Sequence, residues 1–549
     1  MHITDKLSRP VIMLTTAVSA FVLSIPLWMP INGHDGWIHL NWLEQFTRLF
    51  REGDLYPRWM PDSFSGFGSP AFYVYPPLTY WFASLISFVG LHSGESLFYA
   101  MSIVSVFASW ATFYMYAREM QFSKHSSLIG AASYSFAPYV MIDVAIRNSL
   151  TENVAFIWVP LIFIGIERWI VGGNTTRKRT LGAALFVFAT SCLLLTNIPT
   201  FIISSIASFI YILSRKCERS IVRRLLLYIV GIVFASLLTM FYIGQAINVQ
   251  NYLSTSRLWS ILGDVSIHRW MLGVGEEHQH FRDLFLAITL LLAMLTFALV
   301  WKMTRRHDVA RSIFALSLLV IFFQVPYLAD GLYNLSVLRY IQFDQRWNII
   351  LTFTTAVSIV LLVESKYRYA MEIISSSLTV AACVPVVVTV FFSNPPSREI
   401  VDNYHNDPPE YITKYVEDST IAFPTYFGTT GMKSFIEGSD SISWKRIGSS
   451  TYEITKSAEA AVDIYIKLQY FPFWWLSQPP MDRIVLFADK SGIIRARLPK
   501  GKANYHLTQV VAGSVAYEML SLLSLLLIVL IITAYYFKKS LLQLLRKVN

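Results

Sequence analysis

The residues best suited to chemistry are carboxylates and arginines at the edges of long apolar stretches. Asp35 lies in the segment INGHDGWIHLNWLEQF, and His39 follows four residues later. If the chain is helical from Gly36 onward, both side chains share one face. A carboxylate beside apolar surface has a raised pKa and suits a general base. The compatible alternative is that Asp35 caps the helix, since Asp is a favoured N-cap residue.

A second group of ionisable residues lies in the segment SFAPYVMIDVAIRNSLTENVAFIWVPL, which carries Asp143, Arg147 and Glu152 between two apolar runs. Ionisable residues near membrane depth are costly and often functional. Asp143 and Arg147 are four residues apart and are also placed to pair with each other on a helix. Glu152 has no such local partner, which makes it the better catalytic candidate, while Asp143 is a candidate for substrate binding.

Arginines mark candidate sites for an anionic group. Gln342 and Arg346 are four residues apart in RYIQFDQRW, at the mouth of a predicted membrane span. An arginine there suits a phosphate or diphosphate leaving group. Anchoring to lipid headgroups is the alternative. Arg58 is a further candidate for phosphate binding.

Aromatic residues are dense in the segment GDLYPRWMPDSFSGFGSPAFYVYPPLTYW, where five prolines exclude a long helix. Tyr73 and Tyr75 are candidates for binding substrate, as part of a wall on which a sugar stacks. The alternative, which the physics alone favours, is an aromatic belt at the membrane interface.

Two histidines raise the question of a metal. His278 and His280 stand in GEEHQH, and with Glu276 or Glu277 they are residue types that bind divalent ions. Together with Asp35 they form a candidate ligand set for Mg²⁺ or Mn²⁺. Their spacing matches no closed metal motif and favours a solvated polar loop instead.

The composition indicates which elements must position these residues. The chain has 549 residues, of which 54% are hydrophobic and 15% charged, whereas a soluble domain has about 25% charged residues. Apolar runs of about 16 to 22 residues recur along the chain, as expected for helices that cross a bilayer. The net charge of +10 comes from basic clusters in short loops, which excludes nucleic acid as the partner. We therefore predict an all-α polytopic membrane protein.

About 12 spans are predicted from the apolar runs. They are 11–30, 96–117, 127–142, 153–170, 181–197, 198–214, 225–246, 284–301, 312–328, 347–364, 371–392 and 516–537. With the N-terminus in the cytoplasm, every basic cluster falls on the cytoplasmic side of the cell (inner or plasma) membrane, and so does the C-terminus. Residues 76–92 do not fit this alternation and are predicted to dip into the membrane.

Three regions follow from this topology. Residues 1–392 form the transmembrane domain, with the chemistry placed in the first loop (31–75) on the outer face. Residues 393–515 are polar and hold alternating stretches such as AVDIYIKL and IIRARLPKG, which predict a small extracytoplasmic β-rich domain. Residues 516–549 form a final transmembrane helix with a basic cytoplasmic tail.

The order of several short motifs resembles one family. An Asp after the first helix is followed by Tyr-Pro-Arg-Trp, Gly-Phe-Gly-Ser-Pro and Tyr-Pro-Pro-Leu, then by Leu-Thr-Glu, Ile-Gln-Phe and a late Phe-Pro-Phe-Trp-Trp segment. This order is similar to that of bacterial and archaeal membrane proteins labelled 6-pyruvoyl-tetrahydropterin-synthase-related. These proteins are akin to YfhO-like proteins and to the GT-C glycosyltransferase superfamily. The resemblance covers most of the chain.

The resemblance implies an inverting transferase that moves a sugar from a polyprenyl-phosphate donor to an extracytoplasmic glycan, lipid or protein acceptor. It implies the catalytic role for Asp35, with Glu152 at the family's Leu-Thr-Glu position and Arg147 as its loop arginine. His39 and Glu152 would assist, directly or through a metal. One departure is that Asp344 and Gln345 stand where family members often have Pro-Trp.

Other function classes remain open alternatives. No nucleotide-binding or zinc-protease motif is present, which disfavours ATP- or NAD-driven chemistry within this chain. A transporter or flippase would place ionisable residues in the middle of the spans and often show internal repeats. A non-catalytic scaffold for envelope assembly is the third alternative.

Overall fold

The computed structural model describes most of the chain. The described residues are 31, 35–172, 175–254, 301–302, 307–324, 332, 335, 337–364, 411–415, 435–478, 483–489 and 492–548. The predicted spans 11–30 and 371–392 lie outside them, as do His278 and His280.

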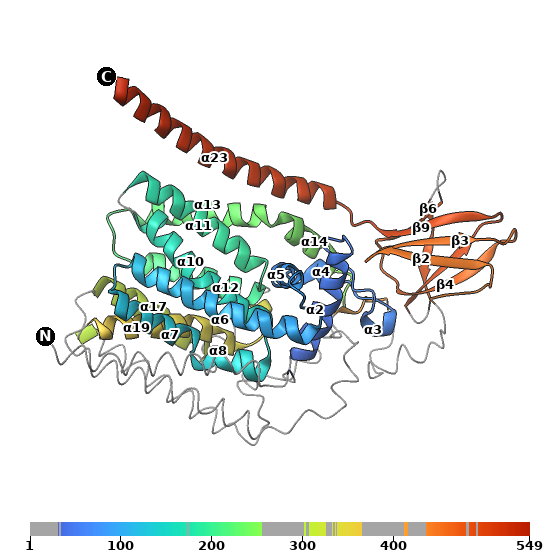
Figure 1. The fold of residues 1–549 in the computed structure, drawn as a ribbon, viewed down its shortest axis with the longest axis horizontal. Coiled ribbons are helices and arrows are strands. Elements are labelled where there is room, and N and C mark those ends of the chain that lie inside the picture. Colours follow the sequence, from blue (N-terminus) through green and yellow to red (C-terminus); the bar gives the residue numbers. More distant parts are fainter. Residues whose placement is uncertain are drawn as a thin grey trace, which may run out of the picture.

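Helices make up the larger part of the described chain, and most of them run roughly parallel in one bundle (Figure 1). In chain order they are α2 (Gly36–Arg51), α3 (Ser63–Gly66), α4 (Ala71–Val74), α5 (Leu78–Ser87), α6 (Gly94–Glu119), α7 (Lys124–Ser135), α8 (Pro138–Ile142), the π-helix η2 (Asp143–Arg147), α9 (Leu150–Ala155), α10 (Trp158–Gly165), the π-helix η3 (Ile166–Gly172), α11 (Thr176–Leu194), α12 (Ile198–Ser214), α13 (Ile221–Leu238), α14 (Met240–Gln250), α17 (His307–Gln324), the 3₁₀-helices η6 (Leu338–Ile341) and η7 (Asp344–Trp347), α19 (Asn348–Val363) and α23 (Ser514–Val548).

Within the described residues, five helical stretches are long and apolar enough to cross a membrane. They are Gly94–Glu119, Leu150–Gly172, Ile221–Leu238, His307–Gln324 and Asp344–Val363. The membrane class predicted from composition is confirmed by these stretches, whereas the count of about 12 spans is not. One predicted span, 225–246, is divided at Thr239 into α13 and α14.

Helix α5 (Leu78–Ser87) lies in the segment 76–92, which did not fit the alternation of cytoplasmic and outer loops. It has 10 residues, so it is about 15 Å long, half of the roughly 30 Å of hydrocarbon that a span must cross. One side buries Tyr80 and Ala83, and α5 packs against α2 and α6. The exposed side carries Leu85, and Phe88 and Val89 follow, also exposed. The helix is too short to cross a bilayer, in line with the predicted dip.

The strands form a small sandwich of two antiparallel sheets with the orders β1-β4-β8-β7 and β2-β3-β9-β5-β6. The strands are β1 (Ile436–Glu437), β2 (Ile442–Gly448), β3 (Thr451–Lys456), β4 (Val462–Gln469), β5 (Trp474–Ser477), β6 (Arg483–Ile484), β7 (Leu486–Ala488), β8 (Ile493–Leu498) and β9 (Ala503–Gln509). The inward side chains of both sheets form one core, which includes Ile454, Ile464 and Leu507. The predicted β-rich domain is confirmed, and the two alternating stretches named above form the paired strands β4 and β8.

The β domain lies at the end of the bundle where α2 to α5 lie (Figure 1). The two parts meet at the first loop (31–75). Trp59 packs against Trp474 with 5.1 Å between ring centroids, and the Gln469 side-chain amide donates to the Gly68 carbonyl. The Tyr73 hydroxyl donates to Gln509 Oε1 at 3.0 Å. The first loop is therefore held between the helices and the sandwich.

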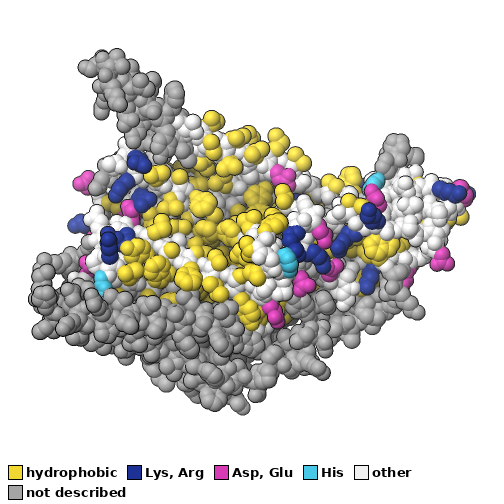
Figure 2. Space-filling view, viewed as in Figure 1, with side chains coloured by type: hydrophobic (Ala, Val, Ile, Leu, Met, Phe, Trp, Pro, Cys, Tyr) yellow, Lys and Arg dark blue, Asp and Glu magenta, His cyan; other side chains and the backbone are white. Residues whose placement is uncertain are grey.

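Polar and apolar side chains are separated along the molecule. Figure 2 shows a broad band of hydrophobic side chains over the helical bundle, with Lys and Arg gathered at the end away from the β domain. Charged side chains of both signs gather where the bundle meets the β domain. This distribution is typical of a protein whose middle lies in hydrocarbon.

Candidate functional site

The start of α2 is bonded to a segment more than 100 residues further along the chain. The Asp35 backbone N–H donates to the Arg147 carbonyl at 3.1 Å. A Cβ on Gly36 would lie 3.1 Å from Asn148 Oδ1, so a larger residue would need the Asn148 side chain to shift. Asp35 occupies the N-cap position, but its side chain makes no cap hydrogen bond and is half-buried. Capping therefore does not account for this carboxylate.

Five charged residues meet at this point, and we name them the charged cluster: Asp35, Asp143, Arg147, Glu152 and Arg346. Arg147 Nη1 contacts the Asp143 carboxylate and lies 3.2 Å from Glu152 Oε2. Arg346 Nε lies 3.4 Å from the same Glu152 oxygen. The carboxylates of Asp143 and Glu152 are completely buried. Glu152, which had no local partner in the sequence, thus joins two arginines.

A break in the helix brings Arg147 and Glu152 together. The π-helix η2 ends at Asn148, whose φ of 54° and ψ of 39° lie in the left-handed region. Asn is one of the few residues that adopt this region at low cost. The N–H groups of Asn148 and Ser149 both donate to the Asp143 carbonyl. The chain thereby reverses within one turn, and π-helical turns of this kind are frequent at functional sites.

Arg346 is held by the residues just before it. Its Nη1 donates to Gln342 Oε1 at 2.8 Å and to the Ile341 carbonyl at 2.9 Å. The predicted pair of Gln342 and Arg346 is formed, with Gln342 orienting the guanidinium. Asp344 and Gln345, which depart from the family pattern, are both buried in η7.

Three uncharged residues of the site were not identified from the sequence. The Tyr139 hydroxyl donates to Glu152 and accepts from Arg147 Nη1. Tyr139 follows Pro138 in the segment that carries Asp143. Because its neighbours are apolar, it falls within the predicted span 127–142.

The other two join the predicted Tyr75 to the same turn. The Tyr75 hydroxyl lies 3.0 Å from Thr151 Oγ1, and Asn197 Nδ2 donates to that oxygen at 3.2 Å. Thr151 directly precedes Glu152 in the chain. Nothing in the sequence linked Asn197, 46 residues away from Thr151, to this position.

Burial shifts the pKa values of several ionisable groups at the site. Burial raises the pKa of Asp143, and the Glu152 carboxylate adds to that rise. Burial also lowers the pKa of Arg147, but the Asp143 and Glu152 carboxylates outweigh it and hold that pKa above its ordinary value. Burial lowers the pKa of His39 to about 4, against the opposing effect of Asp35. His39 is therefore neutral at pH 7, with Nδ1 2.7 Å from the Tyr80 hydroxyl.

These properties define what the charged cluster can do. The guanidiniums of Arg147 and Arg346 contact the same Glu152 oxygen, and within the described part of the chain neither Nη2 donates a hydrogen bond. A phosphate oxygen suits such planar donors. Asp35 is a half-buried residue, whereas Asp143 and Glu152 are fully buried. The cluster thus combines guanidinium donors, which are already paired with Asp143 and Glu152, with a further carboxylate, Asp35, that can accept a proton.

Two predicted phosphate- or substrate-binding residues lie elsewhere. Arg58 Nη2 lies 3.2 Å from Glu518 Oε1 of α23, and its guanidinium stacks over the Tyr56 ring. Tyr73 bonds to Gln509 of the β domain. The structure places both outside the charged cluster.

The described residues offer no group of three or more His, Cys, Asp or Glu that would hold a metal ion. The carboxylates of Asp143 and Glu152 are already paired with arginines. Of the predicted ligands, only Asp35 is described. The described part of the site therefore does not fit Mg²⁺ or Mn²⁺ by itself, and no chemical step is derived through a metal.

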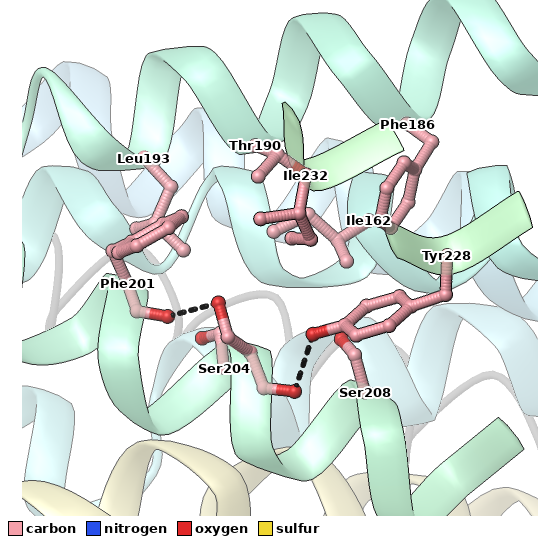
Figure 3. Close-up of a pocket in the computed structure, with 10 residues that line it drawn as sticks. Ile162, Phe186, Thr190, Leu193, Phe201, Ser204, Ser208, Tyr228 and Ile232 are labelled. Carbon is pink, nitrogen blue, oxygen red and sulfur yellow. Dashed lines mark hydrogen bonds between the residues drawn. The ribbon is translucent and has the colours of Figure 1, made fainter. Parts of the chain in front are cut away.

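A separate pocket lies inside the bundle, between α10, α11, α12 and α13. Its lining is mainly apolar, with Phe186 and Ile232 among the residues. Figure 3 shows the hydroxyls of Ser204, Ser208 and Tyr228 at its edge. None of the lining residues belongs to the charged cluster, so this pocket is not the candidate site.

Comparison with known proteins gives structural likeness only. No family model and no curated protein matches the chain, so the label 6-pyruvoyl-tetrahydropterin-synthase-related is not confirmed. Among solved structures, the arabinofuranosyltransferase AftD from mycobacteria is 15% identical with a TM-score of 0.41, over 69% of this chain and 26% of that protein. The Archaeoglobus fulgidus oligosaccharyltransferase is 12% identical with a TM-score of 0.41, over 77% of this chain and 60% of that protein.

ArnT from Cupriavidus metallidurans is 12% identical with a TM-score of 0.32, over 73% of this chain and 84% of that one. The chain thus spans about a quarter of AftD and 60% of the oligosaccharyltransferase. Because the TM-scores are below 0.5, the conclusions on activity below rest on the charged cluster.

Proposed function

We propose that the chain is a membrane glycosyltransferase that moves a sugar from a polyprenyl-phosphate donor to an acceptor hydroxyl at the charged cluster. The observation that carries this proposal is that Arg147 and Arg346 both contact the Glu152 carboxylate, while the Arg147 backbone carbonyl accepts from the Asp35 N–H. A half-buried carboxylate supplies a base, and two adjacent guanidiniums supply a phosphate site.

The reaction proceeds by displacement at the anomeric carbon. Asp35 accepts the proton of the acceptor hydroxyl, and that oxygen forms a bond to the anomeric carbon. The bond from this carbon to the phosphate oxygen breaks, and the lipid phosphate leaves with its electron pair. Arg147 and Arg346 stabilise the negative charge that develops on the departing oxygen. Because the leaving group is already a phosphate, the step needs no ATP.

The other polar residues hold these groups in place. Glu152 and Tyr139 fix Arg147, and Gln342 fixes Arg346. His39 remains neutral and therefore adds no positive charge that would weaken Asp35 as a base. Tyr75 borders the cluster through Thr151, where its ring is available to a sugar.

The test is the substitution Asp35→Asn in the full chain. Loss of a general base lowers turnover by a factor of about 10² to 10⁴, so transfer from a polyprenyl-phosphate sugar should fall by at least a hundredfold while thermal unfolding is unchanged. The matched control is Asp62→Asn, which alters an aspartate of the same loop that pairs with Arg48 and Arg446. Full activity in the Asp35 variant would remove this residue from its proposed role. Movement of the lipid-linked sugar across vesicles without covalent change would instead favour a flippase.

A further inference from the structure

One face of the β domain is an ordered polar surface that the charged cluster does not use. Along the strands of the five-stranded sheet, outward-facing residues alternate with inward-facing buried ones, which include Ile454, Leu476 and Leu507. Antiparallel pairing aligns its side chains in rows across the strands. One row consists of Lys445, Glu453, His506, Ser477 and Arg483, from β2 to β6.

A second row lies next to the first and contains an exposed aromatic ring. Thr508 pairs with Thr451 on one side and with Trp475 on the other. The Trp475 side chain is 38% exposed, and the Arg483 guanidinium lies 4.4 Å from the centroid of its ring. The face therefore offers one apolar ring within a surface of hydrogen-bonding groups.

We propose that this outer face binds the acceptor as a neutral glycan chain. A sugar presents hydroxyls that both donate and accept, together with an apolar face of C–H groups. The face supplies donors in Lys445 and Arg483, an acceptor in Glu453, and groups of both kinds in Ser477 and the threonines. The part of the Trp475 ring that the Arg483 guanidinium leaves exposed packs on the C–H face. Five strands at about 4.8 Å spacing give a length of about 19 Å, enough for an extended chain.

The charges of the face favour a neutral ligand over its rivals. Lys445 stands opposite Glu453, so only the charge of Arg483 is left without a cross-strand carboxylate, and a single positive charge gives a polyanion little to bind. A membrane surface is a poorer partner, because burial in lipid would need further apolar side chains beside Trp475. Its cross-strand neighbour is instead a threonine, and the adjacent row is polar.

The face is connected to the first loop through the strands that form it. Trp474 precedes Trp475 and packs on Trp59 of that loop. Gln509, at the end of β9, accepts the hydrogen bond of Tyr73. The strand that carries Trp475 is thus anchored to the first loop through the neighbouring Trp474. The inference deepens the proposed transferase function and rests on it for the role of the glycan as acceptor.

The test measures binding separately from catalysis. The full-length protein in detergent is applied to an array of neutral oligosaccharides (arabinan, mannan and glucan) and of acidic polygalacturonate. We expect a neutral glycan to bind, and Trp475→Ala to weaken it at least tenfold. The matched control is Phe487→Ala, an exposed aromatic on the other sheet, which should bind as the wild type does. Asp35→Asn should also retain binding, so that failure of the catalytic role and failure of this face are distinguished.

Three results would overturn the proposal. They are an absence of binding to any neutral glycan, a preference for polygalacturonate, and equal losses in the Trp475 and Phe487 variants. The membrane is tested as the rival ligand with a spin label at position 508, introduced as Thr508→Cys after replacing Cys192, Cys217 and Cys383 by serine. Contact of this label with lipid-soluble oxygen in nanodiscs of phosphatidylcholine and phosphatidylglycerol would also overturn it, whereas contact with a water-soluble nickel chelate is expected.

Discussion

Arg147 joins carboxylates that are far apart in the sequence. Its backbone carbonyl accepts from Asp35, and its guanidinium contacts Asp143 and Glu152. Glu152 in turn faces a second guanidinium, that of Arg346. A buried charge of one sign is stable only while its partner is present. The residues of the charged cluster are therefore expected to depend on one another for stability as well as for activity.

Glu152 gives the clearest test of this dependence. Removal of one partner of a buried ion pair costs about 3 to 5 kcal/mol, so Glu152→Ala should lower the unfolding temperature in detergent distinctly. Glu152→Gln retains the shape and should cost less. Glu459→Ala, which removes a carboxylate that is 77% exposed and paired with Lys502, is the control and should change stability by less than about 1 kcal/mol. An unfolding temperature of Glu152→Ala equal to that of the wild type would show that the arginines do not need this partner.

His39 predicts a dependence of stability on pH. Its pKa is about 4 in the folded chain, because of burial, and about 6.5 in an unfolded chain. Above pH 6.5 both states are neutral and the full stability is present. As pH falls from 6.5 to 4, only the unfolded state takes up a proton, so stability falls, by as much as about 3 kcal/mol.

The matched variant is His39→Gln, which retains a hydrogen-bonding group near Tyr80 but does not titrate in this range. Unfolding measured between pH 4 and 7 should show a smaller acid-induced loss in this variant than in the wild type. Identical pH profiles would mean that His39 is not the group responsible.

The sequence predicted the five charged residues of the cluster and Gln342, which orients Arg346, but not the other polar residues of the site. Asp35, Asp143, Arg147, Glu152 and Arg346 stood out because charge is rare beside apolar runs. Tyr139, Thr151 and Asn197 gave no such signal, because hydroxyls and amides are common in membrane helices and their partners are far away in the chain. Arg58 also stood out by charge, but its partner Glu518 is 460 residues away, and no local spacing indicated that pair.

At the scale of elements, the first loop is stabilised by the β domain as much as by the helices. Gln469 is fully buried, and its side chain donates to the Gly68 carbonyl and accepts from the Thr413 N–H. Its own N–H donates to the Phe67 carbonyl at 2.9 Å. Gln469 thus connects β4 both with the first loop and with the segment 411–415, which contains Thr413.

Gln469→Ala should loosen the first loop. It leaves buried backbone groups without partners, at a cost of about 1 to 3 kcal/mol each. Hydrogen exchange measured by mass spectrometry should become faster at residues 60–70, while the exchange of α10 remains unchanged. Asn504→Ala, which removes an exposed amide of the same domain, is the control and should leave the loop protected. Unchanged exchange in the Gln469 variant would show that the loop is ordered by the helices alone.

Elements with strict alternation were the most predictable. The stretch from Ala461 and the stretch from Ile493 form β4 and β8 because their apolar residues recur at every second position and fill the sandwich core. The division of one predicted span into α13 and α14 at Thr239 was not predictable. The Thr239 hydroxyl donates to the Ala235 carbonyl. A hydropathy profile averages over many residues and therefore does not predict where one helix ends and the next begins.

At the scale of the whole molecule, the two ends of the bundle carry different polar networks. The charged cluster lies at the end next to the β domain. At the other end, Arg215 joins Glu167 of η3 to Asp308 of α17. Figure 2 shows Lys and Arg side chains gathered at the end of the bundle away from the β domain. The basic end is expected to face the cytoplasm, which would place the β domain and the charged cluster outside.

Cysteine labelling tests this orientation. In a variant whose native cysteines are replaced by serine, Thr455→Cys in the β domain should react with a membrane-impermeant maleimide on intact cells. Lys178→Cys, at the basic end where the side chain is 52% exposed, should react only after the membrane is made permeable. The reverse pattern would invert the proposed topology and place the transfer reaction on the cytoplasmic side.

The left-handed residue between Arg147 and Glu152 has a consequence for how this protein can change during evolution. Asn148 is buried, and most side chains would strain its backbone conformation by about 1 to 2 kcal/mol. Lineages that keep the site should therefore retain Asn, Asp or Gly at this position even where the surrounding apolar residues drift freely. A homologue with a β-branched residue there would be expected to have lost the geometry, and a survey of related genomes can identify such lineages before any of them is purified.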